Sequence, residues 1–353
     1  MYYVLDTNFI PVMVIEEYTS CLWVDRFDKA GEIEIETIPD EMFLKLCKQD
    51  YYIVNTASEH MMIIEGIRIT TDAEEGARLY ITGSSVESIL KRRIIWNKTT
   101  ITGNLQNGIK KLLTENIISP TIEDRKISNF IFKESTDPGI TSLEYTNEYD
   151  KDNLYDAITD ICKTKQIGFK ITRNASNLFV FELYAGNNHS YEQTANSVVL
   201  FSPKMDNLKN SEYKSSIENS INVIYVIGGS NSDKSVVLGA TTGLLRRETY
   251  LNAGAKPNDY SGTENAFLTE KGNEQLNEEK EEKIFEGDVY TTGMFVLGED
   301  FLLGDIVQIE NEYTIRDTVR VKEIVYSDSN DSNTVYPTFE AYSPLVEEEE
   351  NST

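Results

Sequence analysis

Residues 228–235 have the composition of a phosphate-binding loop. They read Gly-Gly-Ser-Asn-Ser-Asp-Lys-Ser and directly follow an apolar run. A loop that wraps phosphate with backbone amides has the pattern Gly-x-x-x-x-Gly-Lys-Ser/Thr, which needs glycine where Asp233 stands. A carboxylate at that position repels phosphate, and Val236-Val237-Leu238 is typical of a strand rather than a helix. The sequence therefore favours a hairpin loop over a nucleotide site.

A second polar run, Ser327–Asn333, contains the oxygen-bearing side chains that calcium prefers. An EF-hand loop needs a central glycine and a bidentate glutamate at its twelfth position. This run has no glycine, and Phe339 falls at the twelfth position. A solvated turn is therefore favoured over a calcium site.

Only two histidines, His60 and His189, are available for a catalytic triad or a zinc site. Neither lies in a His-Glu-x-x-His motif, and the chain has no Gly-x-Ser-x-Gly elbow. A hydrolase that uses two carboxylates stays open, because 59 acidic residues always contain some pair. We predict no catalytic, cofactor-binding or metal-binding residue, and we expect that the protein is not an enzyme.

Two arginine doublets stand out because the chain is otherwise strongly acidic. One interpretation is partial burial against local carboxylates, and the other is a contact between subunits. The candidates for inter-subunit contacts are Arg92, Arg93, Trp96, Arg246 and Arg247.

The charge balance limits the classes of partner. The 353-residue chain has 33 Lys plus Arg against 59 Asp plus Glu, a net charge of −26. Nucleic-acid binding needs cations that neutralise phosphates, so a sequence-reading role is disfavoured. Such acidity suits solubility, or a surface that repels a polyanion. The length predicts two to four domains, and the 40% hydrophobic content is ordinary for a globular protein.

Cysteines and the N-terminus indicate the compartment. Cys21, Cys47 and Cys162 are widely separated, so we expect buried, reduced thiols. The chain does not begin like a signal peptide, and no apolar run reaches membrane-spanning length. We therefore expect a soluble protein made in the cytoplasm.

The first hundred residues predict antiparallel strands. Glu32–Glu36 alternates apolar and charged side chains, and Met61–Thr70 and Ala77–Thr82 flank a polar turn. About six short strands in this region predict a small barrel or sandwich. A helix is then expected from the capping pattern Ser84-x-x-Glu87.

The rest of the chain mixes helices and strands. We expect helices near residues 105–116, 153–165 and 265–283, and a hairpin formed by 168–173 and 177–184. Strands are expected again from 197 to 227 and from 289 to 342. The segments Glu65–Asp72 and Lys322–Ser329 echo each other, because each is a strand that runs into an acidic turn. This echo favours two related β-modules separated by α+β material.

Residues 59–96 contain the blocks Ile64-Glu65-Gly66-Ile67, Thr71-Asp72, Thr82-Gly83, Glu87-Ser88-Ile89-Leu90 and Arg92-Arg93-Ile94. Through these blocks the segment resembles the first barrel of a siphovirus tail hub, also called the tail-associated protein. Further similar blocks are Tyr18–Arg26 with Gly31-Glu32, Gly243–Tyr250, Leu303–Val307, Arg320–Ile324 and Pro337–Glu340. Ser84-Ser85 departs from the arginine-serine pair that is frequent in relatives. The resemblance covers about residues 1–343.

The resemblance implies a fold shared with the baseplate hubs of contractile tails. The expected class is α+β and rich in β: two small antiparallel β-barrel (tube) domains joined by α+β accessory domains. The predicted parts are 1–98 (first barrel), 99–190 (accessory), 191–235 plus 286–344 (second, discontinuous barrel), 236–285 (insertion with a charged helix) and 345–353 (disordered acidic tail).

The implied function is a structural tail-tip hub. Three chains with two similar barrels each would form a pseudo-sixfold ring that extends or closes the tail tube, and DNA would pass without specific binding through an acidic lumen. The implied partners are further copies in a homotrimer, the distal tail protein, the tail tube, the tape measure protein, and tail fibre or receptor-binding proteins. The expected location is the tail tip of the virion. The alternatives are a tail-associated cell-wall hydrolase and a receptor-binding module.

Overall fold

The computed structural model describes residues 1–344 except 75, 230–231, 259, 261, 292 and 330–331. The fold is α+β and mostly β. The acidic tail predicted to be disordered, 345–353, lies outside the described residues. Within the described part, no helix combines the length and the apolar character needed to cross a bilayer.

The N-terminal region is built from strands. They are β1 (Tyr2–Leu5), β2 (Pro11–Ile15), β3 (Ser20–Arg26), β4 (Glu32–Thr37), β5 (Tyr52–Asn55), β6 (Met61–Asp72) and β7 (Gly76–Ser85). Helix α1 (Glu41–Leu46) and a 3₁₀ helix (Val86–Arg92) complete the region.

The central region surrounds two amphipathic helices, α2 (Leu105–Leu113) and α4 (Leu154–Thr164). A π-helical turn (Thr114–Ile118), a 3₁₀ turn (Glu123–Arg125) and the short helix α3 (Pro138–Thr141) accompany them. The strands are β8 (Thr99–Ile101), β9 (Phe130–Lys133), β10 (Asn147–Tyr149), β11 (Gly168–Arg173) and β12 (Phe179–Tyr184). The expected hairpin is confirmed, because β11 pairs with β12 along its whole length.

The C-terminal region returns to strands around an inserted unit. Its strands are β13 (Leu200–Phe201), β14 (Leu208–Ser216), β18 (Glu282–Val289), β19 (Ile306–Glu310), β20 (Arg316–Ser329) and β21 (Asn333–Ala341). The inserted unit contains β15 (Val223–Gly228), β16 (Lys234–Leu238), β17 (Glu248–Gly254) and α5 (Glu264–Glu278). Two 3₁₀ turns complete the region, Pro203–Met205 and Gly243–Leu245.

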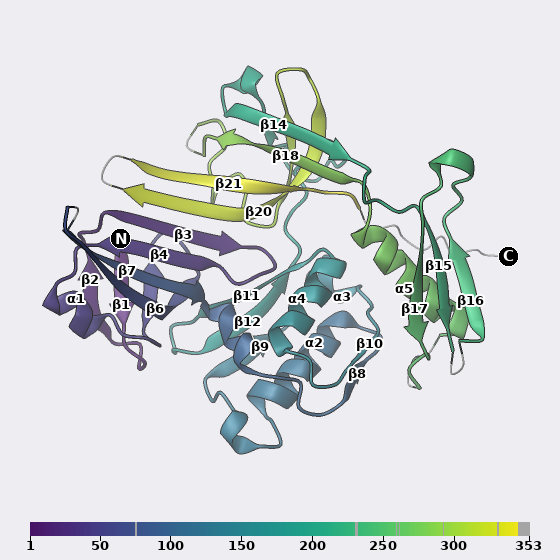
Figure 1. Cartoon of the computed structure of the whole chain (residues 1–353), viewed down its shortest axis with the longest axis horizontal. Helices are drawn as coiled ribbons and strands as arrows, with labels where there is room; N and C mark the ends of the chain where they lie inside the picture. The colour runs from purple at the N-terminus through teal and green to yellow at the C-terminus, as the bar shows by residue number, and fades with distance from the viewer. Residues whose placement is uncertain are drawn as a thin grey trace.

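One large sheet joins the two ends of the chain (Figure 1). Its strand order is β13-β19-β20-β3-β4-β7-β6-β5-β1-β2, and β21 pairs with β20. The described residues form no closed barrel, so the two separate barrels expected from the sequence are not confirmed. The reason is that β3 pairs with β20, so that it is not available to close a barrel with β2.

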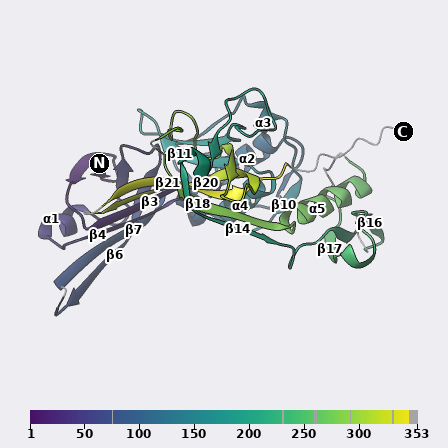
Figure 2. The same ribbon diagram turned by 90° about the horizontal axis from the view of Figure 1, so that it is seen from above.

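The two long hairpins that the sequence echo indicated, β6–β7 and β20–β21, share a β-bulge that the sequence did not predict. In β6, the register shifts between Ile64 and Gly66, and in β20 it shifts between Val321 and Glu323. Each β-bulge leaves one extra residue, Glu65 or Lys322, and increases the local twist. From the bulge, each hairpin continues as regular antiparallel pairs. Figure 2 shows the β6–β7 hairpin projecting from the body of the molecule.

The predicted capping box is wrong. Ser84 lies in β7, where its hydroxyl donates a hydrogen bond to Glu65 at 2.8 Å. The helix that follows is 3₁₀, and the Ser85 side chain at its N-cap accepts a hydrogen bond from Gly31 N instead. Glu87 is buried and bonds to groups outside the helix. The Ser-x-x-Glu spacing therefore has the residue types of a capping box, but these side chains do not form its hydrogen bonds.

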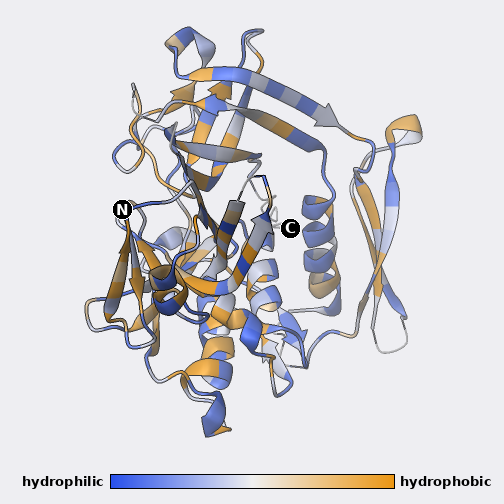
Figure 3. Cartoon of the chain, turned by 60° about the vertical axis from the view of Figure 1, so that its left-hand side comes forward, coloured by the Kyte–Doolittle hydropathy of each residue, from blue (hydrophilic) through white to orange (hydrophobic). Residues whose placement is uncertain are grey.

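The inserted unit is largely separate in its packing. Its own core consists of Ile224, Val226, Phe267 and Leu268. Helix α5 is mostly hydrophilic (Figure 3), as expected for a charged helix. It ends at Glu278, earlier than predicted, because Glu282 and Lys283 pair with Ser216 and Ser215. Strands β15 and β16 pair antiparallel up to Gly228↔Lys234, so the expected hairpin is confirmed.

Candidate functional site

The large sheet presents a polar face along its central strands. In β4 the buried residues are Ile33, Ile35 and Thr37, so Glu32, Glu34 and Glu36 project from the opposite face. Glu34 lies between Leu22 of β3 and Thr82 of β7 in the register. This face, together with neighbouring strands on either side, forms what we call the strand wall: β14, β18, β21, β20, β3, β4, β7 and β6.

The junction between β3 and β20 holds the two halves of the strand wall together. It is a continuous antiparallel pairing from Glu323↔Arg26 to Ser329↔Ser20. Arg26 bridges Glu323 at 2.7 Å and Glu32 at 2.8 Å, and these two carboxylates raise its pKa although burial alone would lower it. On the other face, Tyr326 lies opposite the fully buried Trp23. Polar contacts therefore stabilise one face of the junction, and apolar contacts stabilise the other.

The strand wall ends in two free edges among the described residues. The Gly66–Thr71 part of β6 pairs only with β7, and β14 pairs only with β18. Ile67 and Ile69 share a face with the buried Ile81 and Leu79, yet 37% and 49% of their surfaces are exposed. An apolar pair at an open strand edge is a template for pairing with another chain.

The structure places the two arginine doublets in separate regions. Arg92 forms an ion pair with Asp50 at 3.0 Å, and Arg93 donates to the carbonyl of Arg125 at 3.2 Å. Trp96 is 45% exposed and lies under the Arg125 guanidinium at 5.2 Å. No hydrogen bond or ion pair in the described residues joins this group to the second doublet.

The second doublet precedes β17 in the inserted unit. Arg246 forms an ion pair with Glu248, and Arg247 donates to the carbonyl and the hydroxyl of Ser220, both at 3.1 Å. In each doublet, one arginine pairs with a local carboxylate and the other bonds to a backbone carbonyl. These contacts match the interpretation of local pairing, and the role between subunits stays a prediction.

A buried charge cluster lies beneath β3 and the 3₁₀ helix. His60 Nδ1 is 3.1 Å from Glu87 Oε1, and the same oxygen accepts from Ile171 N at 2.7 Å. Burial alone would lower the pKa of His60, but the carboxylates of Asp25 and Glu87 raise it from 6.5 to about 9. Burial opposes ionisation of Glu87 as well, yet His60 holds the pKa of Glu87 below its ordinary value. The two side chains therefore form a buried ion pair.

Asp25 completes this cluster. Its carboxylate accepts hydrogen bonds from Trp23 Nε1 at 2.7 Å and from Ser58 Oγ at 2.6 Å. Burial raises the pKa of Asp25. His60 bonds through its ring to Glu87 and not to Ser58, so the cluster is not the chain of nucleophile, base and orienting acid that a triad requires. No three His, Cys, Asp or Glu side chains among the described residues are placed to hold a metal ion.

The other histidine belongs to a separate loop. His189 Nδ1 lies 2.8 Å from the carbonyl of Ser197, and its Nε2 lies 3.5 Å from Asp305. The two histidines therefore act in different parts of the fold. The candidate calcium run lies in the β20–β21 turn, of which residues 330–331 are outside the described part.

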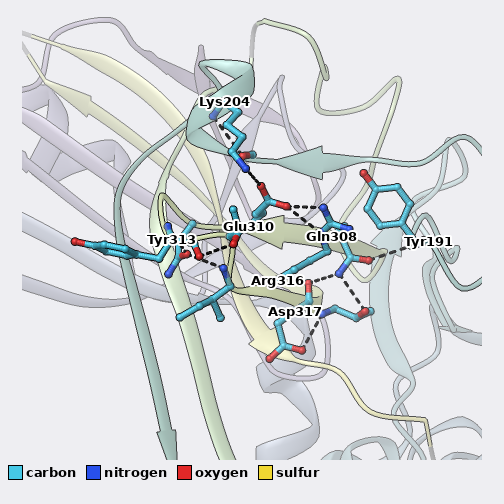
Figure 4. Close-up of polar contacts among 12 residues, drawn as sticks. Tyr191, Lys204, Gln308, Glu310, Tyr313, Arg316 and Asp317 are labelled. Carbon is cyan, nitrogen blue, oxygen red and sulfur yellow. Dashed lines mark hydrogen bonds and ion pairs between the residues drawn. The ribbon is translucent and has the colours of Figure 1, made fainter.

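A polar cluster stabilises the outer part of the sheet around β19 (Figure 4). The nearly buried Glu310 accepts from Lys204 at 2.8 Å and from Arg316 at 2.5 Å, and these bonds lower its pKa. Gln308 reaches the carbonyl of Asp317 at 2.6 Å. These contacts tie the β13 segment to β19 and β20. Tyr313 stands at the tip of the turn and is 83% exposed.

Comparisons with solved structures identify tail proteins with this fold. A tail protein from Neisseria meningitidis MC58 has a TM-score of 0.63 at 14% identity, covering 98% of this chain and 97% of its own. The prophage MuSo2 43 kDa tail protein from Shewanella oneidensis has 0.60 at 10%, covering 96% and 97%. The prophage tail protein gp18 from Listeria monocytogenes EGD-e has 0.59 at 11%, covering 98% and 95%. At these identities the likeness shows the fold.

The sequence comparison gives the family. No curated protein matches the chain. Residues 1–339 match the family described as siphovirus ReqiPepy6 Gp37-like protein. Because this match spans nearly the whole chain, the chain belongs to the siphovirus ReqiPepy6 Gp37-like family, and its fold is that of solved phage tail proteins.

Proposed function

We propose that this tail protein is a structural hub at the tail tip, in which three copies form a ring of six similar wall segments. The observation that carries the proposal is the β3–β20 junction. It sets a segment from each end of the chain side by side in one strand wall (Figure 1). A chain that supplies two such segments can match a sixfold tube with three subunits.

The two halves of the strand wall correspond strand by strand. The N-terminal half has the order β3-β4-β7-β6. In the C-terminal half, the separate two-stranded sheet β14-β18 lies beside β21, which pairs with β20. The bulged hairpin β20–β21 corresponds to β6–β7, and the pair β14–β18 corresponds to the hairpin β3–β4. The inserted unit takes the place of the short turn between β3 and β4. This correspondence supports a duplicated wall module.

The correspondence also specifies how neighbouring copies would meet. Within the chain, β20 pairs with β3. By equivalence, the free edge of β6 in one copy would pair with the free edge of β14 in the next. Ile67 and Ile69 occupy the places of Ile324 and Tyr326 when the two bulges are aligned. Ile324 is only 2% exposed because the junction covers it, whereas the two β6 isoleucines lack that cover.

The register of this contact follows from the paired ends of the hairpins. Val24↔Glu32 is the last pair before the β3–β4 turn, and Ser216↔Glu282 is the last pair before the inserted unit. Aligning these pairs sets Ser215 of the next copy opposite Ile69. It also sets Ile217, which is 52% exposed, opposite Ile67. Two exposed isoleucines would then cover each other.

A disulfide tests this register directly. The double variant Ile69→Cys with Ser215→Cys should form a covalent trimer under mild oxidation, because residues directly opposite have Cβ atoms about 4.5–5.5 Å apart. The measurement is non-reducing gel electrophoresis, and a reducing agent should return the cross-linked trimer to single chains. The native cysteines Cys21, Cys47 and Cys162 are buried and do not interfere.

The matched control is Ile69→Cys with Lys214→Cys. A shift of one residue turns the partner side chain to the opposite face of the sheet, so this pair should not cross-link. Monomers under oxidation, or equal cross-linking of the two pairs, would contradict the proposed contact.

The polar face of the strand wall would line the lumen. Three glutamates of β4 and Glu323 of β20 project from it, and Arg26 and Arg78 are among the cations that neutralise part of this charge. Like-charge repulsion would keep a passing DNA from sticking. The purified protein is therefore expected to show no retention of a short DNA duplex in a mobility-shift assay at low salt. Tight binding that resists added salt would contradict an acidic lumen.

The proposed position in the virion is the tail tip. There the ring would join the distal tail protein and the tail tube to fibre or receptor-binding proteins, and it would contact the tape measure protein. The role is structural rather than catalytic. It is supported by the family match and by the shared fold of tail proteins.

A further inference from the structure

A cavity of about 480 Å³ lies where three parts of the chain meet. The first part is β3 with residues 57–60, the second is the β11–β12 hairpin, and the third is Thr291 and residues 296–303 with β20 and β21. The volume falls within the range of about 300–1,000 Å³ that is typical of small-molecule sites. Neither the arginine doublets nor the free strand edges line it.

One end of this cavity is apolar. Ile324 and Val335 come from the β20–β21 hairpin, and Leu297, Leu302 and Leu303 come from the segment before β19. Tyr326 belongs to the same wall, and its hydroxyl is held by the carbonyl of Ala57 at 3.1 Å. A hydrocarbon body can therefore bury its surface here without leaving a buried polar group unpaired.

The other end is polar and carries excess negative charge. Asp25 and His60 line the cavity, and Glu87 lies directly behind His60. One imidazolium faces two carboxylates, so the cluster has a net charge of about −1 when all three are ionised. At the rim, Lys170 and Glu59 neutralise each other at 2.6 Å. The field inside the cavity therefore favours a cation.

Asp25 has the capacity to bind that cation. A carboxylate offers about four acceptor positions, and Trp23 and Ser58 use two of those on Asp25. Burial raises the pKa of Asp25, which means that the ionised carboxylate lacks full compensation in the chain itself. The ammonium group of a ligand would supply the missing compensation by donating a charge-assisted hydrogen bond to Asp25.

We propose that this cavity is a binding site for a small amphipathic amine, with its hydrocarbon body among the leucines and its ammonium on Asp25. Trp23 is in direct hydrogen-bond contact with that carboxylate, so it reports on the site. The inference is independent of the ring proposed above, because each chain contains the whole cavity.

The test uses tryptophan fluorescence. The chain has only two tryptophans, so Trp96→Phe leaves Trp23 as the sole reporter. Octylamine is titrated at neutral pH. Octanol and octanoate are titrated in parallel, because they have a hydrocarbon chain of similar length but carry a hydroxyl or a carboxylate in place of the ammonium. We expect saturable binding of octylamine at one site per chain, and binding of the other two weaker by at least about tenfold.

Two variants locate the ligand within the cavity. Asp25→Asn should weaken octylamine binding by about tenfold or more, because it removes the charge while keeping the acceptor for Trp23. Val335→Phe should weaken it by filling the apolar end without touching Asp25. Asp160→Asn, at an exposed aspartate on α4 that does not line the cavity, is the control and should bind as the parent does.

Three results would overturn the proposal. The first is the lack of saturable octylamine binding to a folded protein, as judged by circular dichroism. The second is equal affinity for the amine, the alcohol and the acid, which would indicate non-specific partition. The third is unchanged affinity in both Asp25→Asn and Val335→Phe.

Discussion

Glu87→Ala is expected to lower the free energy of unfolding by about 3–5 kcal/mol, which is the usual cost of removing one partner of a buried ion pair. Glu87 is 1% exposed, and its carboxylate serves both His60 and the backbone amide of Ile171. Without it, an imidazolium and an amide remain buried without their acceptor. The measurement is denaturant unfolding followed by circular dichroism, with the exposed Glu123→Ala as control.

The pH dependence separates this ion pair from a simple packing effect. The folded-state pKa of His60 is raised to about 9, so its contribution is complete below about 6.5 and is lost as pH rises through 9. A shift of that size corresponds to roughly 3 kcal/mol. For Glu87 the pKa is lowered, so its contribution is lost only as pH falls below its ordinary range. The parent should therefore lose stability between pH 7 and 9.5, whereas Glu87→Ala should lose much less. Parallel curves for the two proteins would exclude the ion pair as the cause.

A second large effect is expected for the strand edge. Ile67→Asp combined with Ile69→Asp should convert the proposed trimer to monomers in light scattering. Placing charges at a buried contact costs about 4 kcal/mol for each interface, or about a thousandfold in affinity. The monomer should stay folded, because both side chains are already partly exposed in one chain.

The control for this experiment uses isoleucines of matched exposure. Ile122 and Ile131 are 39% and 37% exposed, and Ile122→Asp with Ile131→Asp should leave the assembly intact. Charge reversal of Arg92 and Arg93 tests the competing interface. If that variant becomes monomeric while the β6 variant does not, the contact lies at the arginine doublet and the strand pairing is wrong.

Sequence reasoning succeeded where structure is local. The β11–β12 hairpin and helix α4, with its N-cap at Asn153, follow from hydrophobic period and from turn residues close in sequence. It also found the two bulged hairpins, because an acidic turn after a strand is a short-range signal. The resemblance to tail proteins was confirmed by the family match.

The rest depends on pairs that are distant in sequence. The pairing of β3 with β20 leaves no local signal in the sequence, since the residue pattern of each strand is compatible with many partner strands. For the same reason, closed barrels were expected where an open sheet formed. Glu87 was assigned to a capping box because it stands three residues after Ser84. Its position among Val86, Ile89 and Leu90 was a signal for a buried, paired carboxylate.

The inserted unit leaves the strand wall at Ser216 and re-enters it at Glu282, and these two residues are directly paired. The inserted unit therefore occupies the position of a hairpin loop, but it has a hydrophobic core of its own. Loops whose ends already touch gain length at a small and slowly rising entropic cost. The length and sequence of the inserted unit can therefore vary while the strand order that surrounds it is preserved.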